Sequence, residues 1–473
     1  MITRQEIMDS SREFGLSPNV IEKDYVLGWM LDGISRHSKT SADWAFKGGT
    51  CLKKCYFETY RFSEDLDFTL KNHEYINKDF LTEAFREIAD RVYEKTGIEM
   101  PKEMISFEIY QNPRGKLSAE GKISYRGPMQ TGGFLPRIKL DLTADEIIVL
   151  NPVSRKVHHP YSDKPENGIH IQSYCFEELF AEKIRALAER LRPRDLYDVI
   201  HLYRHNDIRP DRAVLLKTLK QKCDFKKIPP PSIKSIKNMP ERVELETEWG
   251  NMLAHQLAVL PPYEQFWQEL PKAFEWIYQA AEKVMISPIP SGNVIVDESW
   301  QMPAMVKTWH TATTAPLETI RFAAANRLCV NLAYQGSMRL IEPYSLRMTK
   351  DGNLLLYAVK HNTGEDRSYR VDRIQNAQIT NTPFEPKYAV ELTATGTISA
   401  PPTATKAKSQ GISSLYGSTR GRKSGFGPTY FIECSYCQKR FKRTKYTTRL
   451  NPHKNQYGQT CLGRMGYIVD TKY

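Results

Sequence analysis

Apolar residues follow two different periods along the first 285 residues of the chain. They alternate with polar residues in SEDLDFTL and PRIKLDLTAD, which predicts two strands, and Trp44 to Phe46 predicts another short strand. Elsewhere they recur at helical spacing, as through 176–191 and in a run that ends near Val284. Pro193 is suited to begin the helix that follows the first of these runs. This pattern predicts an α+β fold with a helical portion.

The rest of the chain separates into smaller blocks. ISPIPSGNVIVDES interrupts the helical pattern, and a segment rich in Thr, Ser, Gly and Pro follows residue 383. Between them lie one helical pattern and several short apolar runs, and KDGN at 350–353 predicts a hairpin between two of these runs. We therefore expect a first domain, a linker, a small β-rich domain, a flexible basic linker and a terminal module, at 1–285, 286–314, 315–383, 384–428 and 429–473.

Length and composition limit the class of protein. A chain of 473 residues is long enough for two or three domains, and its 40% hydrophobic and 26% charged residues argue against general disorder. No apolar run approaches the ~18 residues that span a bilayer, and the first ten residues, MITRQEIMDS, lack the features of a signal peptide. Eight cysteines in such a chain do not indicate a disulfide framework. We expect a cytoplasmic protein that does not bind membranes.

Charge is unevenly distributed along the sequence. From residue 401 onward there are 14 Lys and Arg residues and two acidic residues, so the whole net charge of +12 lies in this tail. Such an asymmetry indicates contact with a polyanion, most often nucleic acid, although a basic tail can also serve only solubility.

The strongest chemical signal lies in WAFKGGTCLKKCYFETYRFSEDLDFTL. Gly48 and Gly49 allow a sharp turn after the first strand, and we expect Thr50 to cap a helix whose first N–H groups suit a phosphate. Asp65 and Asp67 lie two residues apart in a strand, so both carboxylates face the same side. Such a pair also fits a solvated strand face.

A third carboxylate strengthens the interpretation of this pair as a metal site. In PRIKLDLTAD, Arg137, Lys139 and Asp141 share one face of a predicted strand. Adjacent carboxylates repel one another unless a cation lies between them, and Mg²⁺ prefers such oxygen ligands. Three carboxylates on neighbouring strands would form a two-metal site for phosphoryl or nucleotidyl transfer.

These residues match a known family. FKGGTCLKKCY followed by RFSEDLDF resembles the AbiEii/AbiGii-type nucleotidyltransferase toxins of bacterial phage-defence and toxin–antitoxin systems, within the DNA polymerase β-like superfamily. The resemblance continues in IEKDYVLGWML and in FEELFAEKIRALAERLRPRDLYDVIHL, and it covers roughly residues 10–280.

The resemblance implies a set of functional residues. A nucleoside triphosphate would be held by Gly48, Gly49, Thr50, Ser63 and Lys183. Mg²⁺ (or Mn²⁺) binding and catalysis would fall to Asp65, Asp67, Asp141, Lys183 and either Asp195 or Asp198. Helical spacing places Lys183 and Arg190 near one side of a helix, where a lysine can neutralise a triphosphate or simply face solvent. Asp195 could instead serve only the N-terminus of the next helix.

The middle block resembles the WYL domain, an Sm/SH3-like β-barrel of bacterial regulators. The matching stretches are IEPY at 341–344 and RSYRVDRI at 367–374, whereas three leucines at 354–356 replace the naming triplet. Such domains are thought to sense nucleotides or nucleic acid, and the resemblance and spacing suggest a cationic, aromatic surface formed by Arg367, Tyr369, Arg370 and Arg373. A purely structural barrel with solubilising edge charges is equally compatible with the sequence.

The terminal module carries four candidate zinc ligands. Cys434 and Cys437 form a Cys-x2-Cys knuckle, and His453 and Cys461 follow at spacings that can close a tetrahedron. Four protein ligands leave no open position, so we expect a structural Zn²⁺. Free thiols are the alternative. Basic residues interleaved with aromatic ones between the ligands suit phosphate contacts and base stacking.

Together these features predict a metal-dependent nucleotidyltransferase toxin with accessory units for nucleic-acid binding or regulation. The resemblance implies an RNA acceptor, such as the 3′ end of tRNA, and a possible cognate antitoxin. One alternative is a protein acceptor. Another is a nucleic-acid-binding regulator in which the transferase fold is only a scaffold.

Overall fold

The computed structural model describes most of residues 1–392 and parts of the C-terminal module. The described residues are 1–112, 114–130, 133–205, 210–278, 287, 289, 315–348, 354–392, 429–434, 437, 439–443, 450, 451, 453, 454, 460, 461 and 466–472. The expected linker 286–314, apart from 287 and 289, and residues 393–428 of the second linker lie outside them. The chain divides into two compact units, Met1–Lys406 and Ala407–Tyr473.

Seven strands form a mixed sheet in the order β3-β4-β5-β2-β1-β7-β6. β2 pairs parallel with β5 and β1 parallel with β7, whereas the other neighbours are antiparallel. The three strands predicted from the sequence, two of them from alternation, are confirmed as β1, β2 and β5. The bounds are β1 (Trp44–Lys47), β2 (Asp65–Leu70), β3 (Ile105–Gln111), β4 (Leu117–Ser124), β5 (Arg137–Thr143), β6 (Val153–Val157) and β7 (Ile169–Ser173).

The two faces of this sheet differ in polarity. Leu66 and Phe68 of β2 and Leu140 and Leu142 of β5 are buried, whereas the residues between them are polar and only partly buried. Apolar residues on the first face pack with those of α2 (Pro18–Arg36) and α5 (Lys78–Thr96) in one continuous core. The opposite face of β2 and β5 is therefore left for the acidic residues, as the period of two predicts.

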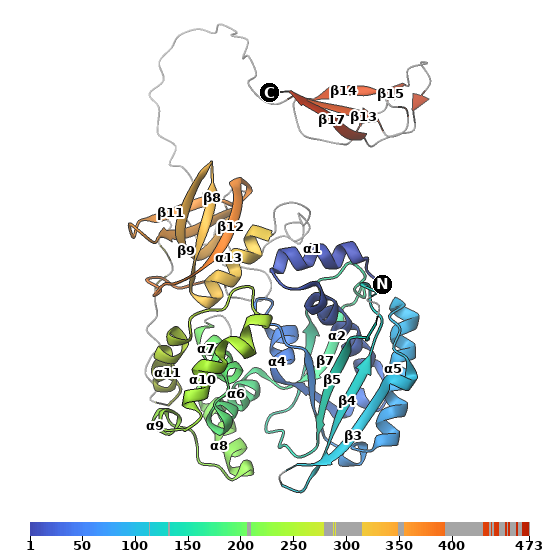
Figure 1. Cartoon of the computed structure of the whole chain (residues 1–473), viewed down its shortest axis with the longest axis vertical. Helices are drawn as coiled ribbons and strands as arrows, with labels where there is room; N and C mark the ends of the chain where they lie inside the picture. The colour runs from blue at the N-terminus through green and yellow to red at the C-terminus, as the bar shows by residue number, and fades with distance from the viewer. Residues whose placement is uncertain are drawn as a thin grey trace, which may run out of the picture. The chain divides into compact units, whose positions relative to one another are not determined.

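Helices form a second group beside the sheet. Figure 1 shows α6 to α11 gathered on one side of the N-terminal sheet and α5 on the other. α6 and α7 correspond to the helical pattern and to the helix start predicted at Pro193, and Val284 lies outside the described residues. The remaining bounds in this part are α1 (Arg4–Phe14), α3 (Thr40–Asp43), α4 (Gly48–Cys51), α6 (Phe176–Arg190), α7 (Pro193–Arg204), α8 (Arg212–Lys226), α9 (Ile233–Lys237), α10 (Arg242–Leu253) and α11 (Tyr263–Tyr278). Within the described parts of the chain, no helix combines the length and apolarity needed to cross a bilayer.

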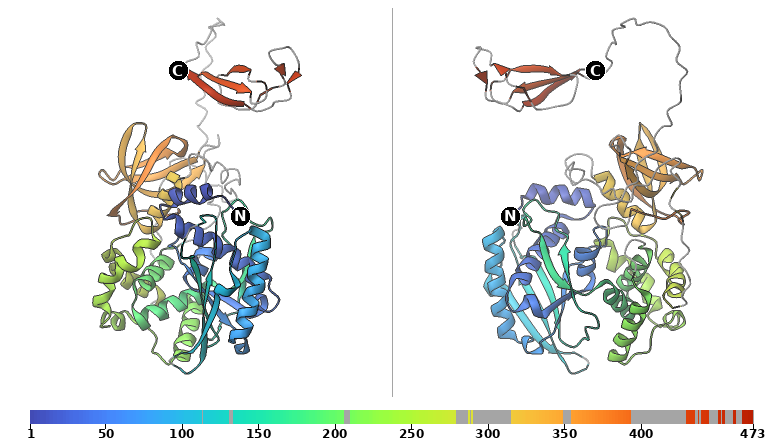
Figure 2. Two further views of the ribbon diagram at one scale, coloured as in Figure 1. Left: turned by 45° about the vertical axis from the view of Figure 1, so that its right-hand side comes forward. Right: turned by 180° about the vertical axis from the view of Figure 1, so that it is seen from behind.

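A five-stranded antiparallel sheet follows, in the order β11-β10-β9-β8-β12. α13 (Ala315–Asn326) packs against β12, β8 and β9, and both views in Figure 2 show a yellow helix beside the orange sheet. β9 and β10 pair as the predicted hairpin, although the KDGN turn itself lies outside the described residues. The bounds are β8 (Leu328–Tyr334), β9 (Ser337–Met348), β10 (Leu354–Lys360), β11 (Asp366–Arg370) and β12 (Ile374–Pro383).

This second core extends beyond the predicted boundary at 383. Phe384, Val390 and Leu392 are buried in the same apolar cluster as Leu346 and Val359. The first residues of the segment expected to be a flexible linker are therefore packed, because their apolar side chains cover the sheet.

The C-terminal unit contains two small sheets. β13 (Thr429–Cys434) lies between β14 (Arg440–Arg443) and β17 (Gly466–Lys472), and β15 (His453–Lys454) pairs with β16 (Thr460–Cys461). Among its described side chains, Ile432, Cys434, Leu450 and Cys461 form a buried cluster.

Candidate active site

Three carboxylates stand side by side on the polar face of the N-terminal sheet. Asp65 and Asp67 project from β2, and Asp141 lies directly opposite Asp67 on the parallel neighbour β5. Glu120 on β4 lies opposite Asp141, and Lys139 pairs in register with Asp65. The structure therefore brings together the three carboxylates that the sequence selected.

Their electrostatic environment favours a bound cation. The pKa of Asp67 is raised to about 6, mainly by burial and also by the charges of Asp141 and Asp65, against the effects of Lys47 and Lys183. Burial likewise raises the pKa of Asp141. A divalent cation would relieve this repulsion, so the donor set fits Mg²⁺ or Mn²⁺.

The glycine turn packs directly against these carboxylates. Gly48 has a φ of +79°, and a Cβ placed there would lie 2.0 Å from Oδ2 of Asp67. A Cβ on Gly49 would lie 2.8 Å from Nη2 of Arg61 and 2.9 Å from Oγ of Ser63. Both positions therefore require glycine, because the backbone of the turn approaches side chains of the site.

Thr50 does not cap the helix, contrary to the prediction. α4 begins at Gly48 and continues as a π-helical turn, η1 (Leu52–Tyr56), so Thr50 lies inside the helix. Its buried hydroxyl donates a hydrogen bond to the carbonyl of Asp65, 2.5 Å away. The hydroxyl thus ties the glycine turn to the start of β2.

Lys183 belongs to a buried network around Asp198. Its Nζ lies 2.8 Å from Oδ2 of Asp198, whose side chain is completely buried. Arg61 donates to both oxygens of the same carboxylate, at 2.7 and 2.8 Å, and Tyr60 donates a further hydrogen bond. Although burial would raise the pKa of Asp198, Arg61 and Lys183 hold it well below the ordinary value.

Asp195 holds a second cation of α6. Arg190 donates two parallel hydrogen bonds to it, at 2.7 and 2.8 Å, and the Arg190 side chain is 48% exposed while that of Asp195 is 1% exposed. These hydrogen bonds to the carboxylate of Asp195 raise the pKa of Arg190, and the charge of Asp67 also contributes. Asp195 and Asp198 therefore each position a cation within the electrostatic field of the carboxylates.

Three further residues of this site were not singled out from the sequence. Lys47, Arg61 and Glu120 are partly or fully buried, and each contacts or lies in register with a predicted residue. Burial would lower the pKa of Lys47, but its ion pair with Glu146 holds the pKa above the ordinary value. Lys47 directly precedes the glycine turn and Arg61 lies in the same motif stretch, whereas Glu120 lies on β4, a strand that the sequence pattern did not predict.

The candidate surface of the second sheet is arranged differently from the prediction. Tyr369 is 4% exposed and packs edge-on against Tyr334, so its ring belongs to the core and not to a binding surface. Arg367 pairs with Glu365, and Arg370 pairs with Asp372 at 2.6 Å. Arg373 is exposed in the turn that follows β11.

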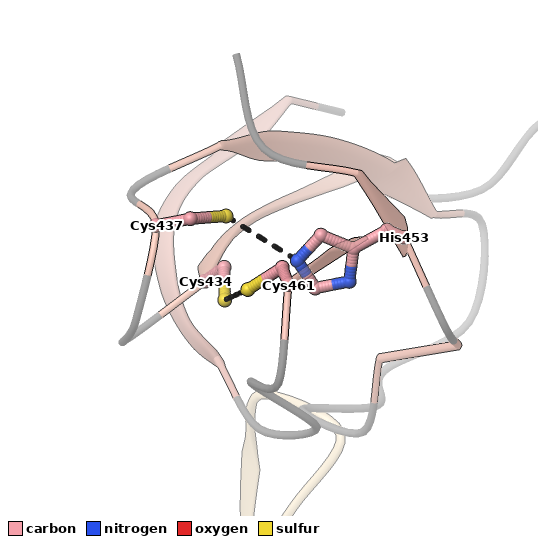
Figure 3. A group of neighbouring side chains, drawn as sticks. All are labelled: Cys434, Cys437, His453 and Cys461. Atoms are coloured by element: carbon pink, nitrogen blue, oxygen red, sulfur yellow. Dashed lines mark hydrogen bonds between the residues drawn. The ribbon is translucent and has the colours of Figure 1, made fainter. Parts of the chain in front are cut away.

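The four predicted zinc ligands converge in the C-terminal unit (Figure 3). Their ligand atoms all lie within 4.8 Å of one another, with 3.9 Å between the sulfurs of Cys434 and Cys461. Zn–S bonds of about 2.3 Å in a tetrahedron place sulfurs about 3.8 Å apart, so the group has the size of a zinc site. Nδ1 of His453 lies 2.9 Å from the carbonyl of Asn451, which leaves Nε2 for the metal.

Two family models match successive parts of the chain. The family model for the nucleotidyl transferase AbiEii toxin of type IV toxin–antitoxin systems matches residues 29–280, and the WYL domain model matches residues 316–379. A comparison with curated protein sequences finds no match.

Two solved structures are similar to the chain. One is the nucleotidyltransferase toxin MenT4 from Mycobacterium tuberculosis H37Rv, at 16% identity and a TM-score of 0.42, covering 59% of this chain and 90% of that one. The other is JHP933 from Helicobacter pylori, at 17% identity and a TM-score of 0.37, covering 57% of this chain and 95% of that one. The AbiEii model itself spans more than half of the sequence. The chain therefore belongs to the AbiEii family of nucleotidyltransferase toxins and carries a WYL domain after its nucleotidyltransferase domain.

Proposed function

We propose that the chain transfers a nucleoside monophosphate from a nucleoside triphosphate to an RNA acceptor in a reaction that requires Mg²⁺ or Mn²⁺. The observation that carries this proposal is the row of Asp65, Asp67 and Asp141, with Asp67 and Asp141 in direct register. Crowded carboxylates with raised pKa values are typical of a site built to hold divalent cations.

Each group around this row has a part in the proposed reaction. Asp65 and Asp67 hold the metal, and the backbone of Gly48 to Thr50, together with Ser63, receives the triphosphate. Lys183 neutralises the phosphates. The buried carboxylate of Asp198, whose Oδ2 lies 2.8 Å from the ammonium of Lys183, holds that ammonium in place. Bound Mg²⁺ would supply charge neutralisation at the reacting phosphate and at the leaving group.

The transfer step balances without a further reactant. The acceptor hydroxyl oxygen forms a bond to the α-phosphorus, and the bond from that phosphorus to the bridging oxygen breaks, so that pyrophosphate leaves. Asp141 either takes the proton of the attacking hydroxyl or assists in holding the metals, since it faces Asp67 across the strand pair.

Charge and family resemblance favour RNA as the acceptor. The tail from residue 401 onward holds 14 basic and two acidic residues, and phosphate contacts by such a segment give affinity that does not depend on sequence. The 3′ end of tRNA is the acceptor that the resemblance suggests. A cognate antitoxin would be the protein partner.

The C-terminal unit is proposed to be a zinc module. Cys434, Cys437, His453 and Cys461 supply four ligands, which leaves no open position for chemistry. The role of the metal would be structural, because the described core of this unit has few apolar residues.

The acceptor can be identified directly. Purified protein is incubated with Mg²⁺, each α-labelled nucleoside triphosphate in turn, and total tRNA. We expect label on tRNA with wild-type protein and none with the double variant Asp65→Ala/Asp67→Ala. Label on protein would show that the acceptor is a protein and not RNA. Equal labelling by the double variant would contradict the assigned site.

A further inference from the structure

A cavity of about 270 Å³ lies where the nucleotidyltransferase domain meets the WYL domain, and Asp65, Asp67 and Asp141 are not among its lining residues. Phe14, Thr59 and Phe62 line it from the first domain, and Glu318 and Phe322 line it from α13. No function described above uses this cavity, yet its walls contain a buried charged group.

That group is Lys53, whose exposed fraction is 5%. Its ammonium donates a hydrogen bond to the carbonyl of Glu58 and lies 4.9 Å from the centroid of the Phe62 ring. Among the residues that the structure describes, no carboxylate forms an ion pair with it. The pKa of Lys53 is lowered to about 8, mainly by burial and also by the charge of Lys54, whereas the charges of Asp24, Glu318 and Glu58 act in the opposite direction.

The adjacent lysine shows what a satisfied buried cation looks like in this protein. Lys54 is 1% exposed, and its Nζ lies 2.7 Å from Oδ2 of Asp24 and 3.0 Å from the carbonyl of the same residue. Two consecutive lysines are thus equally buried, but only Lys54 has a counter-ion. Buried cations are normally paired, so Lys53 is suited to pair with an anion bound in the cavity.

The acidic residues near the cavity do not fill this role. Glu318 lies 3.1 Å from Arg321, and Glu58 lies 3.8 Å from Arg321 and 3.6 Å from His158. Their charges also act on Lys53, but neither forms an ion pair with its ammonium. In the described parts of the chain, the ammonium has only a carbonyl oxygen as its hydrogen-bond acceptor.

Thr59 supplies a second unsatisfied group. Its hydroxyl oxygen is buried and has no hydrogen-bond partner in the described parts of the chain, and the residue contributes to the wall of the cavity. A buried hydroxyl without a hydrogen-bond partner and a buried ammonium without a counter-ion are both costly unless a ligand completes them. Phe14, Phe62 and Phe322 contribute aromatic rings to the apolar part of the wall, together with several aliphatic residues.

We propose that this cavity binds a small ligand with a carboxylate or phosphate group on an apolar or aromatic body. The oxyanion accepts hydrogen bonds from Lys53 and Thr59, and the body lies against the phenylalanine rings. The two domains both contribute to the wall, so the ligand would hold them together.

The same cavity adjoins the network that positions Lys183. Tyr60 and Gln256 line it, Tyr60 donates to Asp198, and Gln256 accepts a hydrogen bond of 2.8 Å from Arg61. A ligand that contacts these side chains would therefore influence the active site. The binding proposal itself does not depend on the reaction proposed above.

Thermal unfolding of the full chain tests the site with three probes: benzoate, phenyl phosphate and inorganic phosphate. We expect saturable stabilisation by benzoate or phenyl phosphate, and the stronger of the two tells a carboxylate site from a phosphate site. Lys53→Met and the isosteric Thr59→Val should each weaken binding at least about tenfold. The stabilisation should persist with saturating nucleoside triphosphate, which occupies the other site.

The unfolding temperatures of the variants without ligand show whether Lys53 serves binding or the stability of the fold. Lys53→Met should unfold at the wild-type temperature or higher, because it removes a buried charge that has no ion-pair partner among the described residues. Lys54→Met should unfold at a lower temperature, because it leaves the buried carboxylate of Asp24 without its counter-ion. The proposal is overturned if Lys53→Met is destabilised like Lys54→Met, or if no probe stabilises the wild type up to about 10 mM. Loss of the probe effect with bound nucleoside triphosphate would also overturn it. Equal affinity for inorganic phosphate and phenyl phosphate would contradict the apolar part of the site.

Discussion

The ammonium of Lys183 lies 2.8 Å from Oδ2 of Asp198, a carboxylate with no exposed surface. Arg61 occupies the other side of this carboxylate with two hydrogen bonds. Asp198 is therefore a positioning residue, since it holds two cations and its surroundings leave it no direct access to solvent. Asp195, which is also buried, positions Arg190 in the same way, but the side chain of Arg190 is about half exposed.

Asp198→Asn is expected to destabilise the protein strongly. The substitution leaves the buried guanidinium of Arg61 and the ammonium of Lys183 without their counter-charge, which costs about 3–5 kcal/mol in comparable buried pairs. Denaturant unfolding measures the loss. Asp195→Asn is the matched control and should cost less, because its partner Arg190 is about half exposed. Equal losses for the two variants would contradict the distinction between them.

Gly48→Ala should abolish most nucleotidyl transfer without unfolding the protein. Alanine at φ +79° is strained by about 1 kcal/mol, and its Cβ would lie 2.0 Å from Oδ2 of Asp67, so the carboxylate must move. Gly97→Ala provides the control, since Gly97 has a φ of +77° and nothing within 4 Å of the added Cβ. We expect similar melting temperatures for the two variants and a large activity loss only for Gly48→Ala. An active Gly48→Ala enzyme would show that the turn does not define the site.

Asp67 should make stability depend on pH in a characteristic direction. Its folded-state pKa is about 6 and its ordinary value is 3.8, so the folded chain binds more protons than the unfolded chain between these values. The contribution of Asp67 to stability is complete below about pH 4 and is lost as pH rises through 6. Without divalent cations, the melting temperature of Asp67→Asn should therefore rise relative to wild type over this range. A constant difference would contradict the crowded-carboxylate interpretation.

Zinc should be present in the purified protein and depend on the C-terminal cluster. X-ray absorption is expected to find three sulfur ligands at about 2.3 Å and one nitrogen at about 2.0 Å. Cys434→Ala should lose the metal, whereas Cys329→Ala, which changes a buried free cysteine of the second sheet, should retain it. Zinc that remains after Cys434→Ala would place the ion elsewhere.

The sequence predicted those parts of the site that depend on local periodicity. Alternation in β2 and β5 placed Asp65, Asp67 and Asp141 on one face, and the parallel pairing of the two strands put Asp67 opposite Asp141. The short spacing of Cys434 and Cys437 indicated a metal site in a similar way. In both cases the chemistry follows from a few neighbouring residues.

Contacts between distant residues were beyond this reasoning. Arg61 and Asp198 are 137 residues apart, and no local pattern shows that a buried arginine would occupy that carboxylate. Thr50 was expected to cap a helix, but the closeness of β2 draws its hydroxyl to the carbonyl of Asp65. Tyr369 was grouped with arginines close to it in sequence as a binding surface, yet its packing against Tyr334 buries the ring.

The most direct test of the catalytic assignment is nucleotidyl transfer by wild type and Asp67→Asn at neutral pH, each with and without Mg²⁺. Asparagine keeps the shape of the side chain and removes the charge that would hold the metal. We expect label transfer only by wild type with Mg²⁺ or Mn²⁺, and a loss of about 100-fold or more for Asp67→Asn despite an unchanged or higher melting temperature. Transfer that persists in a chelator, or a folded Asp67→Asn protein with wild-type activity, would contradict the assignment.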